Sequence, residues 1–330
     1  MTEDEMRSKE YSLCFIDGDL LVYQAAASAQ KRWYAWEHNN TTLETFDSAK
    51  ACKEYQTDAE EFMMEDTSQW IRKDWLVIGE REDAFKALDN AIDNIKKNVK
   101  ARRYDIYVAG EGNFRDNIAK AKKYKGGREN IEKPVHLKAV KEYIVSHWGA
   151  KQVNGIEVDD IGSIIQFKGY CHNPKNPATV HVSVDKDAKG TPGVLYNPTN
   201  NEFLYRDEYN ANLWLFKQSL MGDSVDAIGG LPQLAPELQE KYSAGKRKGV
   251  GEKTAEAILG GCEGIQEMYQ RVLECYQAHY GDSYEFVDWQ GNPVVCSAED
   301  MMDEQMNLLF MLRRKGEYWS DFKRHIKESL

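Results

Sequence analysis

Four short clusters of acidic residues mark this sequence, and three of them directly follow an apolar run; the clusters begin at Asp17, Glu157, Asp185 and Asp223. In α/β proteins, catalytic residues collect where buried parallel strands end. Carboxylates a few ångströms apart repel one another, so a pocket of them needs cations to stay ionised. Hard oxygen ligands suit Mg²⁺ or Mn²⁺. The pattern therefore predicts a multi-carboxylate site for divalent cations.

The composition narrows the class of protein. The chain has 330 residues, of which 42% are hydrophobic and 29% charged, which is ordinary for a soluble globular protein. No apolar run approaches membrane-spanning length, and the polar, acidic N-terminus is unlike a signal peptide. The six cysteines form no CxxC pair, which is typical of a reduced cytosolic protein. We expect a cytoplasmic protein that does not contact membranes.

The distribution of charge points toward a nucleic-acid partner, although the net charge is −11. Residues 96–128 carry a local charge of +8. Separate acidic clusters and basic stretches are what a metal site ringed by phosphate-binding surface requires. A second basic region is formed by Lys241, Lys246, Arg247, Lys248 and Lys253.

The order of apolar runs predicts an α/β fold with a mostly parallel central sheet flanked by helices. Strands are expected at 13–16, 105–109, 180–184 and 194–196, and residues 30–79 are interpreted as a hairpin or irregular insertion. Helices are expected at 20–29, 81–103, 114–124, 134–147 and 157–167. After residue 205 the pattern predicts helices alone, so we place a domain boundary there, between residues 1–205 and 206–330.

Each acidic cluster also has a purely structural interpretation. Asp17 precedes Gly18 in a sequence common in turns, and acids in the first turn of a helix, such as Glu157 and Asp160, are favoured by the helix dipole. The apolar face of that same helix, however, would draw both carboxylates inward. The predicted metal ligands are Asp17, Glu157, Asp159, Asp160, Asp185, Asp187, Asp223 and Asp226.

Two further segments are candidates for phosphate contact. Aromatic side chains lie among the cations of residues 114–128, and this combination is typical of nucleic-acid binding, although a basic run is more often a solvated face. Residues 249–255 resemble a glycine-rich turn leading into a helix, which can bind a phosphate or, through its carbonyls, a monovalent cation.

The order of these motifs resembles the phage and bacterial 5′→3′ exonuclease and flap endonuclease family, in particular the phage replication exonucleases. The resemblance spans residues 12–259. It rests on Phe-Ile-Asp-Gly-Asp at 15–19, Tyr-Lys-Gly-Gly-Arg at 124–128, Glu-Val-Asp-Asp at 157–160, Ser-Val-Asp-Lys-Asp at 183–187, Gly-Asp-Ser-Val-Asp at 222–226 and Gly-Val-Gly-Glu-Lys-Thr-Ala at 249–255. Each motif is short, but their order is specific.

The resemblance implies a two-metal phosphodiesterase with a PIN-like nuclease core, a basic helical arch near 113–130 and a C-terminal helix–three-turn–helix subdomain. Asp17, Glu157, Asp159 and Asp160 match the ligands of the first Mg²⁺ or Mn²⁺ ion, and the later four acids match those around the second. Lys125 and Arg128 match residues that act on the scissile phosphate. The resemblance also implies DNA contacts, with K⁺ at the helix–three-turn–helix, by Arg115, Lys120, Lys122, Lys123, Tyr124, Gly249, Gly251, Lys253 and Thr254.

The sequence departs from the family pattern in two places. The family has a further acid near residues 109–112, where this chain offers only Glu111, which we include among the candidate ligands. An insertion at 231–248 separates the last acids from the glycine-rich turn.

The expected substrate is duplex DNA with 5′ ends, flaps or nicks, and also RNA in RNA–DNA hybrids, cut by a monomer during phage DNA replication and primer removal in the host cytoplasm. Two alternatives stay open. A haloacid-dehalogenase-type phosphatase would use Asp17 as a covalent nucleophile with one Mg²⁺. A non-catalytic DNA-junction binder would keep the fold without cutting.

Overall fold

The computed structural model describes residues 1–129, 131–242 and 249–328. The chain forms two compact units. Unit 1 contains Met1–Asp19, Ile95–Ile131 and Ala150–Leu330, and unit 2 contains Leu20–Asn94 and Glu132–Gly149. The boundary expected near residue 205 falls inside unit 1, because the later helices pack with the sheet-forming segments.

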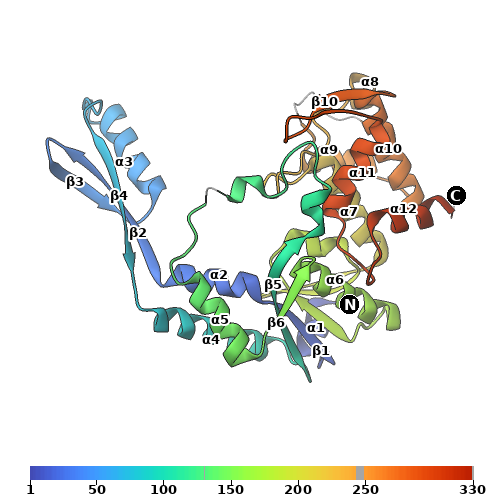
Figure 1. The fold of residues 1–330 in the computed structure, drawn as a ribbon, viewed down its shortest axis with the longest axis horizontal. Coiled ribbons are helices and arrows are strands. Elements are labelled where there is room, and N and C mark those ends of the chain that lie inside the picture. Colours follow the sequence, from blue (N-terminus) through green and yellow to red (C-terminus); the bar gives the residue numbers. More distant parts are fainter. Residues whose placement is uncertain (130, 243–248, 329–330) are drawn as a thin grey trace. The chain divides into compact units, whose positions relative to one another are not determined.

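Unit 1 is built on a six-stranded sheet, which confirms the predicted α/β class with a mostly parallel sheet. Neighbouring strands are parallel except the last pair, and Figure 1 shows β5 and β6 side by side. The central strand is fully buried at Cys14, Phe15 and Ile16, so both sheet faces are covered. The order is β6 (Lys151–Gly155), β5 (Tyr104–Asn113), β1 (Leu13–Asp17), β7 (Thr179–Val182), β8 (Gly193–Asn197) and β9 (Glu202–Arg206).

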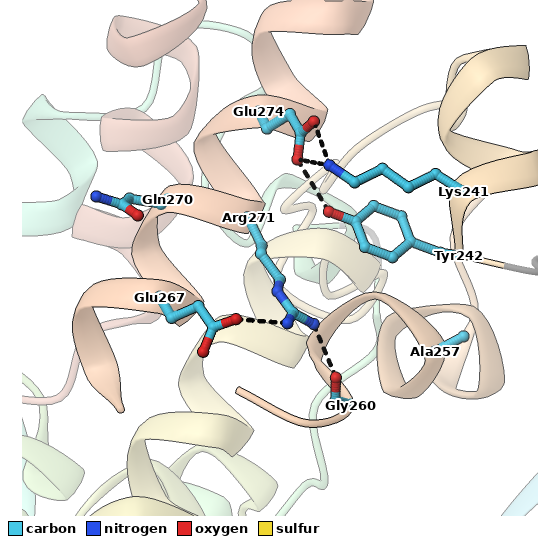
Figure 2. A pocket seen from close by; sticks show the side chains of 8 residues that line it. All are labelled: Lys241, Tyr242, Ala257, Gly260, Glu267, Gln270, Arg271 and Glu274. Carbon is cyan, nitrogen blue, oxygen red and sulfur yellow. Dashed lines mark hydrogen bonds and ion pairs between the residues drawn. The ribbon is translucent and has the colours of Figure 1, made fainter. Parts of the chain in front are cut away.

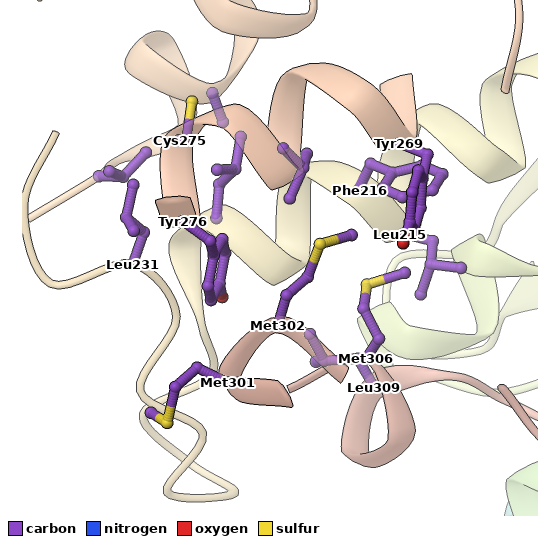
Figure 3. Packing of buried hydrophobic residues seen from close by; sticks show 14 of the residues in the cluster. Leu215, Phe216, Leu231, Tyr269, Cys275, Tyr276, Met301, Met302, Met306 and Leu309 are labelled. Atoms are coloured by element: carbon purple, nitrogen blue, oxygen red, sulfur yellow. The ribbon is translucent and has the colours of Figure 1, made fainter. Parts of the chain in front are cut away.

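Helices form the rest of unit 1. Besides α1 (Glu3–Ser8) and α6 (Val158–His172), they are α7 (Glu208–Met221), α8 (Pro236–Lys241), α9 (Glu252–Leu259), α10 (Ile265–Tyr280), α11 (Ala298–Leu309) and α12 (Trp319–Glu328). Figure 3 shows Phe216, Tyr276, Met302 and Met306 meeting in their shared core. Each such side chain contributes roughly 1.5–3 kcal/mol by leaving water. In the described part of the chain, no helix has the length and apolar character needed to span a bilayer.

Unit 2 contains a three-stranded antiparallel sheet, which the expected hairpin only partly anticipated. Its helix α3 covers one face of this sheet. The Trp36 indole N–H of β2 donates to the Cys52 carbonyl of α3 at 2.6 Å, and Tyr55 of α3 stacks on Trp70, just before β4, at 5.8 Å. The elements are α2 (Gly18–Ser28), which begins in unit 1, β2 (Gln30–His38), β3 (Thr41–Phe46), α3 (Ala49–Glu61), β4 (Ile71–Ile78), α4 (Arg81–Asn98), which ends in unit 1, and α5 (Leu137–Trp148).

The prediction of a helix at 114–124 is wrong. Only Phe114–Asn117 forms a short 3-10 turn. Beyond it, the backbone N–H groups of Lys120 and Ala121 both donate to Glu304 at 2.8 Å, while the indole of Trp289 donates to the Ala119 carbonyl at 3.0 Å. These tertiary hydrogen bonds replace the ones a helix would make, so the expected helical arch is an irregular segment there.

The prediction that strands end after residue 205 is also wrong. β10 (Tyr284–Val287) and β11 (Pro293–Cys296) form an antiparallel hairpin between α10 and α11. Its turn carries Trp289, which holds the 119–123 segment described above. The alternation of Tyr284 and Phe286 is the sequence pattern that could have revealed this strand.

Candidate metal centre

The first and third acidic clusters follow neighbouring parallel strands. β1 ends at Asp17, and β7 is followed by Asp185 and Asp187. Because β1 and β7 are parallel, their carboxyl ends share one edge of the sheet. Gly18 is required beside Asp17, since a Cβ there would lie 2.7 Å from the Tyr107 carbonyl oxygen of β5.

The second cluster is placed by the start of α6. Glu157 is its N-cap, and the backbone N–H of Glu157 donates to the Asp160 carboxylate at 3.1 Å in a capping box. β6 runs parallel to β5 and precedes Glu157 by two residues, so the helix begins at the same sheet edge. The Ser183 hydroxyl donates to Asp159 at 3.3 Å, which ties this cluster to the end of β7.

The fourth cluster lies in a tight turn after α7. Gly222 ends the helix with φ +72°, and a Cβ there would come within 2.5 Å of the Ile228 carbonyl oxygen. Asp223 and Ile228 then exchange backbone hydrogen bonds of 2.8 and 2.7 Å, which closes the turn around Asp226.

Three of the acids lie close enough to share an ion. One ligand oxygen each from Asp187, Asp223 and Asp226 lies within 4.8 Å of the others, and the three residues are only 3–5% exposed. Burial, followed by the neighbouring charges of Asp185, Asp223 and Asp226, raises the pKa of Asp187 to about 8. Burial also raises the pKa of Asp226, against the opposing effect of Lys125 and Arg128.

Asp159 links this group to the remaining acids. Burial raises its pKa well above the ordinary value, and the charges of Asp17, Asp185, Glu157 and Asp187 raise it further. Seven carboxylates from four clusters therefore interact at one sheet edge. The possible ligand atoms are carboxylate oxygens of buried or half-buried residues, and this set fits hard divalent cations.

Several cations border the acids, among them Arg115, whose Nη1 lies 3.8 Å from a Glu157 oxygen. Lys186 lies 3.1 Å from Asp223, and Arg128 pairs with Asp226. Lys125 pairs with Glu157 and lies 3.6 Å from Asp226. Burial opposes the charged form of Lys125, but the two carboxylates outweigh it and raise its pKa. The backbone of Lys125 is left-handed (φ +53°), and its N–H donates to the Asp226 carbonyl at 3.0 Å.

Asp160 and Arg115 differ from the sequence-based expectation. Arg115 was expected to contact DNA, yet it is fully buried, with nitrogens 2.7 and 2.9 Å from the two Asp160 oxygens. Asp160 also accepts the Leu312 N–H at 3.0 Å. In this structure Asp160 is engaged by protein donors, and Arg115 is inaccessible to a nucleic acid.

The other predicted site residues of segment 111–124 differ in their exposure and in their contact with the acids. The side chain of Glu111 is exposed, and its backbone N–H donates to Asn154 at 2.8 Å. Tyr124 is buried, and its hydroxyl lies 3.1 Å from Glu157 and 3.2 Å from Asp226, so it orients acids. Lys120, Lys122 and Lys123 are exposed.

The basic run does not form one continuous surface. Residues 100–103 hydrogen-bond around Tyr11 and Cys14, where β1 begins, whereas the acids follow its other end. Only the 120–128 half is therefore near the acidic edge, which a sequence count of charge could not show.

The glycine-rich turn precedes α9. Gly249 has φ +81°, Gly251 is the N-cap of α9, and Lys253 and Thr254 lie in its first turn. Behind α9 is a cavity of about 760 Å³, where Lys241 pairs with Glu274 (Figure 2). The rest of the second basic region, Lys246, Arg247 and Lys248, lies outside the described residues.

Sequence reasoning missed several residues of the centre. Lys186 lies between two acids in the sequence and was expected to point away from them, so it was not among the predicted site residues, although its ammonium group reaches Asp223. Gln218 donates to Asp187 from the last turn of α7, and no sequence pattern marked it. Asn113 donates to Glu157 at 2.7 Å from the end of β5.

No protein-family model matches the chain, and no curated protein matches it. Among solved structures, it is similar to the bacteriophage T5 D15 protein co-crystallised with metal ions (13% identity, TM-score 0.41, covering 91% of this chain and 98% of that one). It is also similar to the T5 D15 flap endonuclease in a complex with DNA and metal ions (13%, 0.43, 91% and 99%) and to the zinc-bound T5 5′-exonuclease (13%, 0.38, 92% and 100%). These are the kind of protein that the motif order resembles.

Proposed function

We propose that this chain is a metal-dependent nuclease that hydrolyses phosphodiester bonds of DNA, acting 5′→3′ on duplex ends and on flaps. The observation that supports this proposal is the meeting of seven carboxylates at one sheet edge with Lys125 and Arg128 beside them. Two divalent ions explain so many acids better than one ion does. Phosphatase chemistry at Asp17 with a single Mg²⁺ could use Asp223 and Asp226, but it would leave Glu157, Asp159, Asp185 and Asp187 without a role.

The bound ions would activate water and neutralise the oxygens of an in-line displacement. Asp187, Asp223 and Asp226 would hold one ion, and Asp17, Asp159 and Asp185 the other. Glu157 lies between the sites and orients Lys125.

The cations complete the site on the substrate side. Lys125 and Arg128 contact the same carboxylates that would hold the ions, so their charged groups lie within a side chain's reach of a phosphate bound there. Such fixed charges stabilise the negative charge that develops in the transition state. Residues 249–254 would add duplex contacts and a K⁺ site through the turn before α9.

The test is a time course on a 5′-labelled duplex and on a flapped duplex, with Mg²⁺ or Mn²⁺ and with EDTA. We expect short 5′-terminal products that require the divalent ion, and an RNA–DNA hybrid in the same assay extends the test to RNA. Asp185→Asn should abolish cutting while DNA binding persists. Metal-dependent turnover of small phosphate esters without DNA cleavage would favour a phosphatase. A wild type that binds DNA as well as Asp185→Asn does, but never cuts it, would favour a junction binder.

A further inference from the structure

A cavity of about 480 Å³ lies beside the metal centre in unit 1. Residues 121–122 form one wall and residues 227–230 another. The first wall leads within three residues to Lys125, and the second begins directly after Asp226. The Lys125 N–H bonds the Asp226 carbonyl at 3.0 Å, so the two walls meet at the acids.

The third wall is aromatic and comes from the unexpected hairpin and the end of α10. The rings of Tyr280 and Tyr284 lie 4.8 Å apart, and those of Tyr284 and Phe286 lie 5.9 Å apart at 27°. Tyr284 is 37% exposed, so its ring is accessible. Gly229 also lines the cavity, and an added Cβ there would meet no atom within 4 Å. Aromatic rings and a glycine in one lining leave space for a flat group.

The cavity also carries polar and charged groups. Gln305 is 4% exposed, and its Oε1 accepts the Gly230 N–H at 3.1 Å, so its NH₂ group is the donor it brings to the wall. Lys122 lines the cavity with an exposed ammonium group. A ligand with a planar ring, acceptors on its edge and an attached anion matches these features.

We infer that this cavity binds the base of a nucleotide next to the scissile phosphodiester, with Tyr284 as a stacking residue and Lys122 facing the adjoining phosphate. The inference rests on the proposed function and deepens it. Stacking on an aromatic ring is open to every base, so the pocket would position the strand without reading its sequence. The strand would then be fixed by its base as well as by its phosphate.

The test is a cycle that combines loss of a base with loss of the ring. Cleavage is measured on a duplex and on matched duplexes with one abasic residue at successive positions from the 5′ end. For the wild type, one abasic position should lower kcat/KM by about 5- to 150-fold, the range for stacking one base. For Tyr284→Ala, intact and abasic substrates should be cut at the same reduced rate, and Tyr284→Phe should restore the discrimination.

Two further variants separate stacking from a structural effect of the hairpin. Gly229→Leu fills the cavity without removing a contact, and it should also erase the penalty for the abasic residue. Tyr209→Ala is the matched control, because Tyr209 is 39% exposed and lies outside the cavity, and it should keep the full penalty. If Tyr284→Ala slows intact and abasic substrates by equal factors, so that the penalty survives, Tyr284 acts only through the fold and the inference is overturned.

A binding measurement separates this inference from the nuclease proposal. In an Asp185→Asn background, a strand with 2-aminopurine at the sensitive position should lose fluorescence on binding, and Tyr284→Ala should remove that quenching. Wild-type cleavage without quenching at any position refutes the pocket and leaves the nuclease intact. Quenching that depends on Tyr284 in a protein that never cuts DNA refutes the nuclease and leaves the pocket.

Discussion

Unit 1 buries two groups of charged residues that are built in opposite ways. Arg115 and Asp160 form a balanced pair, in which Arg115 also donates to the Leu308 and Phe310 carbonyls at 3.1 and 2.8 Å. Asp187, Asp223 and Asp226 form a group of like charges that Lys186, Lys125 and Arg128 only partly offset. Both groups descend from acidic clusters that look alike in the sequence. Burial with full compensation marks a structural role, and burial without it marks a place for a ligand.

The largest expected effect tests the balanced pair. Asp160→Asn should lower the free energy of unfolding by about 3–5 kcal/mol, because it leaves the buried Arg115 charge uncompensated. Urea denaturation of the variant and the wild type measures the difference. The control is Glu129→Gln, which removes an exposed partner of Lys123 and should cost no more than about 1 kcal/mol. If both variants lose a similar free energy of unfolding, the buried Arg115–Asp160 pair is worth no more than the exposed Lys123–Glu129 pair.

A substitution in the acidic group should have the opposite effect: it should reduce activity without lowering stability. Asp187→Asn should reduce metal-dependent cleavage by more than about 100-fold, since even residues that only orient ligands are worth 10- to 100-fold. In EDTA the same variant should unfold no more easily than the wild type, because it removes repulsion and keeps an acceptor for Gln218. Activity and denaturation are measured on one preparation.

Stabilisation of the fold by Mn²⁺ provides a second test of the same variant. At one hundred times its dissociation constant, the ion should stabilise the wild type by about 2.7 kcal/mol, and Asp187→Asn should lose most of that gain. Equal stabilisation of the two proteins would show that the ion binds elsewhere.

Lys125 is intermediate between these two groups, since it is paired with Glu157 but also lies where the proposed function would bring a phosphate. Lys125→Ala should lower kcat by about 100-fold, the scale for losing one fixed charge-stabilising group, with little change in KM. Steady-state kinetics on the labelled duplex provides both constants. A rise in KM with kcat preserved would reassign Lys125 to holding the strand.

The smallest expected effect concerns a paired acid near the surface. Hydrogen bonds from Lys327, Tyr269 and Lys323 outweigh partial burial and lower the pKa of Glu299 to about 2. Between about pH 2 and the ordinary glutamate pKa near 4.5, the unfolded chain holds a proton that the folded chain lacks. The stabilisation is therefore complete above that window and is lost as the pH falls through it. Glu299→Gln should flatten the acid loss of stability, measured by denaturation at pH 6 and pH 3.

Much of the metal centre could be predicted from the sequence because local patterns determine it. Apolar runs before Asp17 and Asp185 indicated strands, and the parallel arrangement brings their ends to one edge. The fate of Asp160 could not be predicted, since it depends on Arg115 and on residues 308–312.

The errors in the fold have similar causes. The 114–124 segment has helix-forming residues, but Glu304 and Trp289 bind its backbone from far along the chain. The three-stranded sheet of unit 2 was predicted only as a hairpin or irregular insertion, because its tryptophans hid the alternation of β2 and β4.

The dependence of Arg115 on the Leu308 and Phe310 carbonyls has a consequence for biosynthesis. Residues 308–312 must be synthesised before the Arg115–Asp160 pair has all of its partners, long after Asp17 has been made. Domains generally fold as units once their last contacting segment is available. The start of α6, and with it Glu157, is therefore fixed only late in translation, after the distal helices have been made.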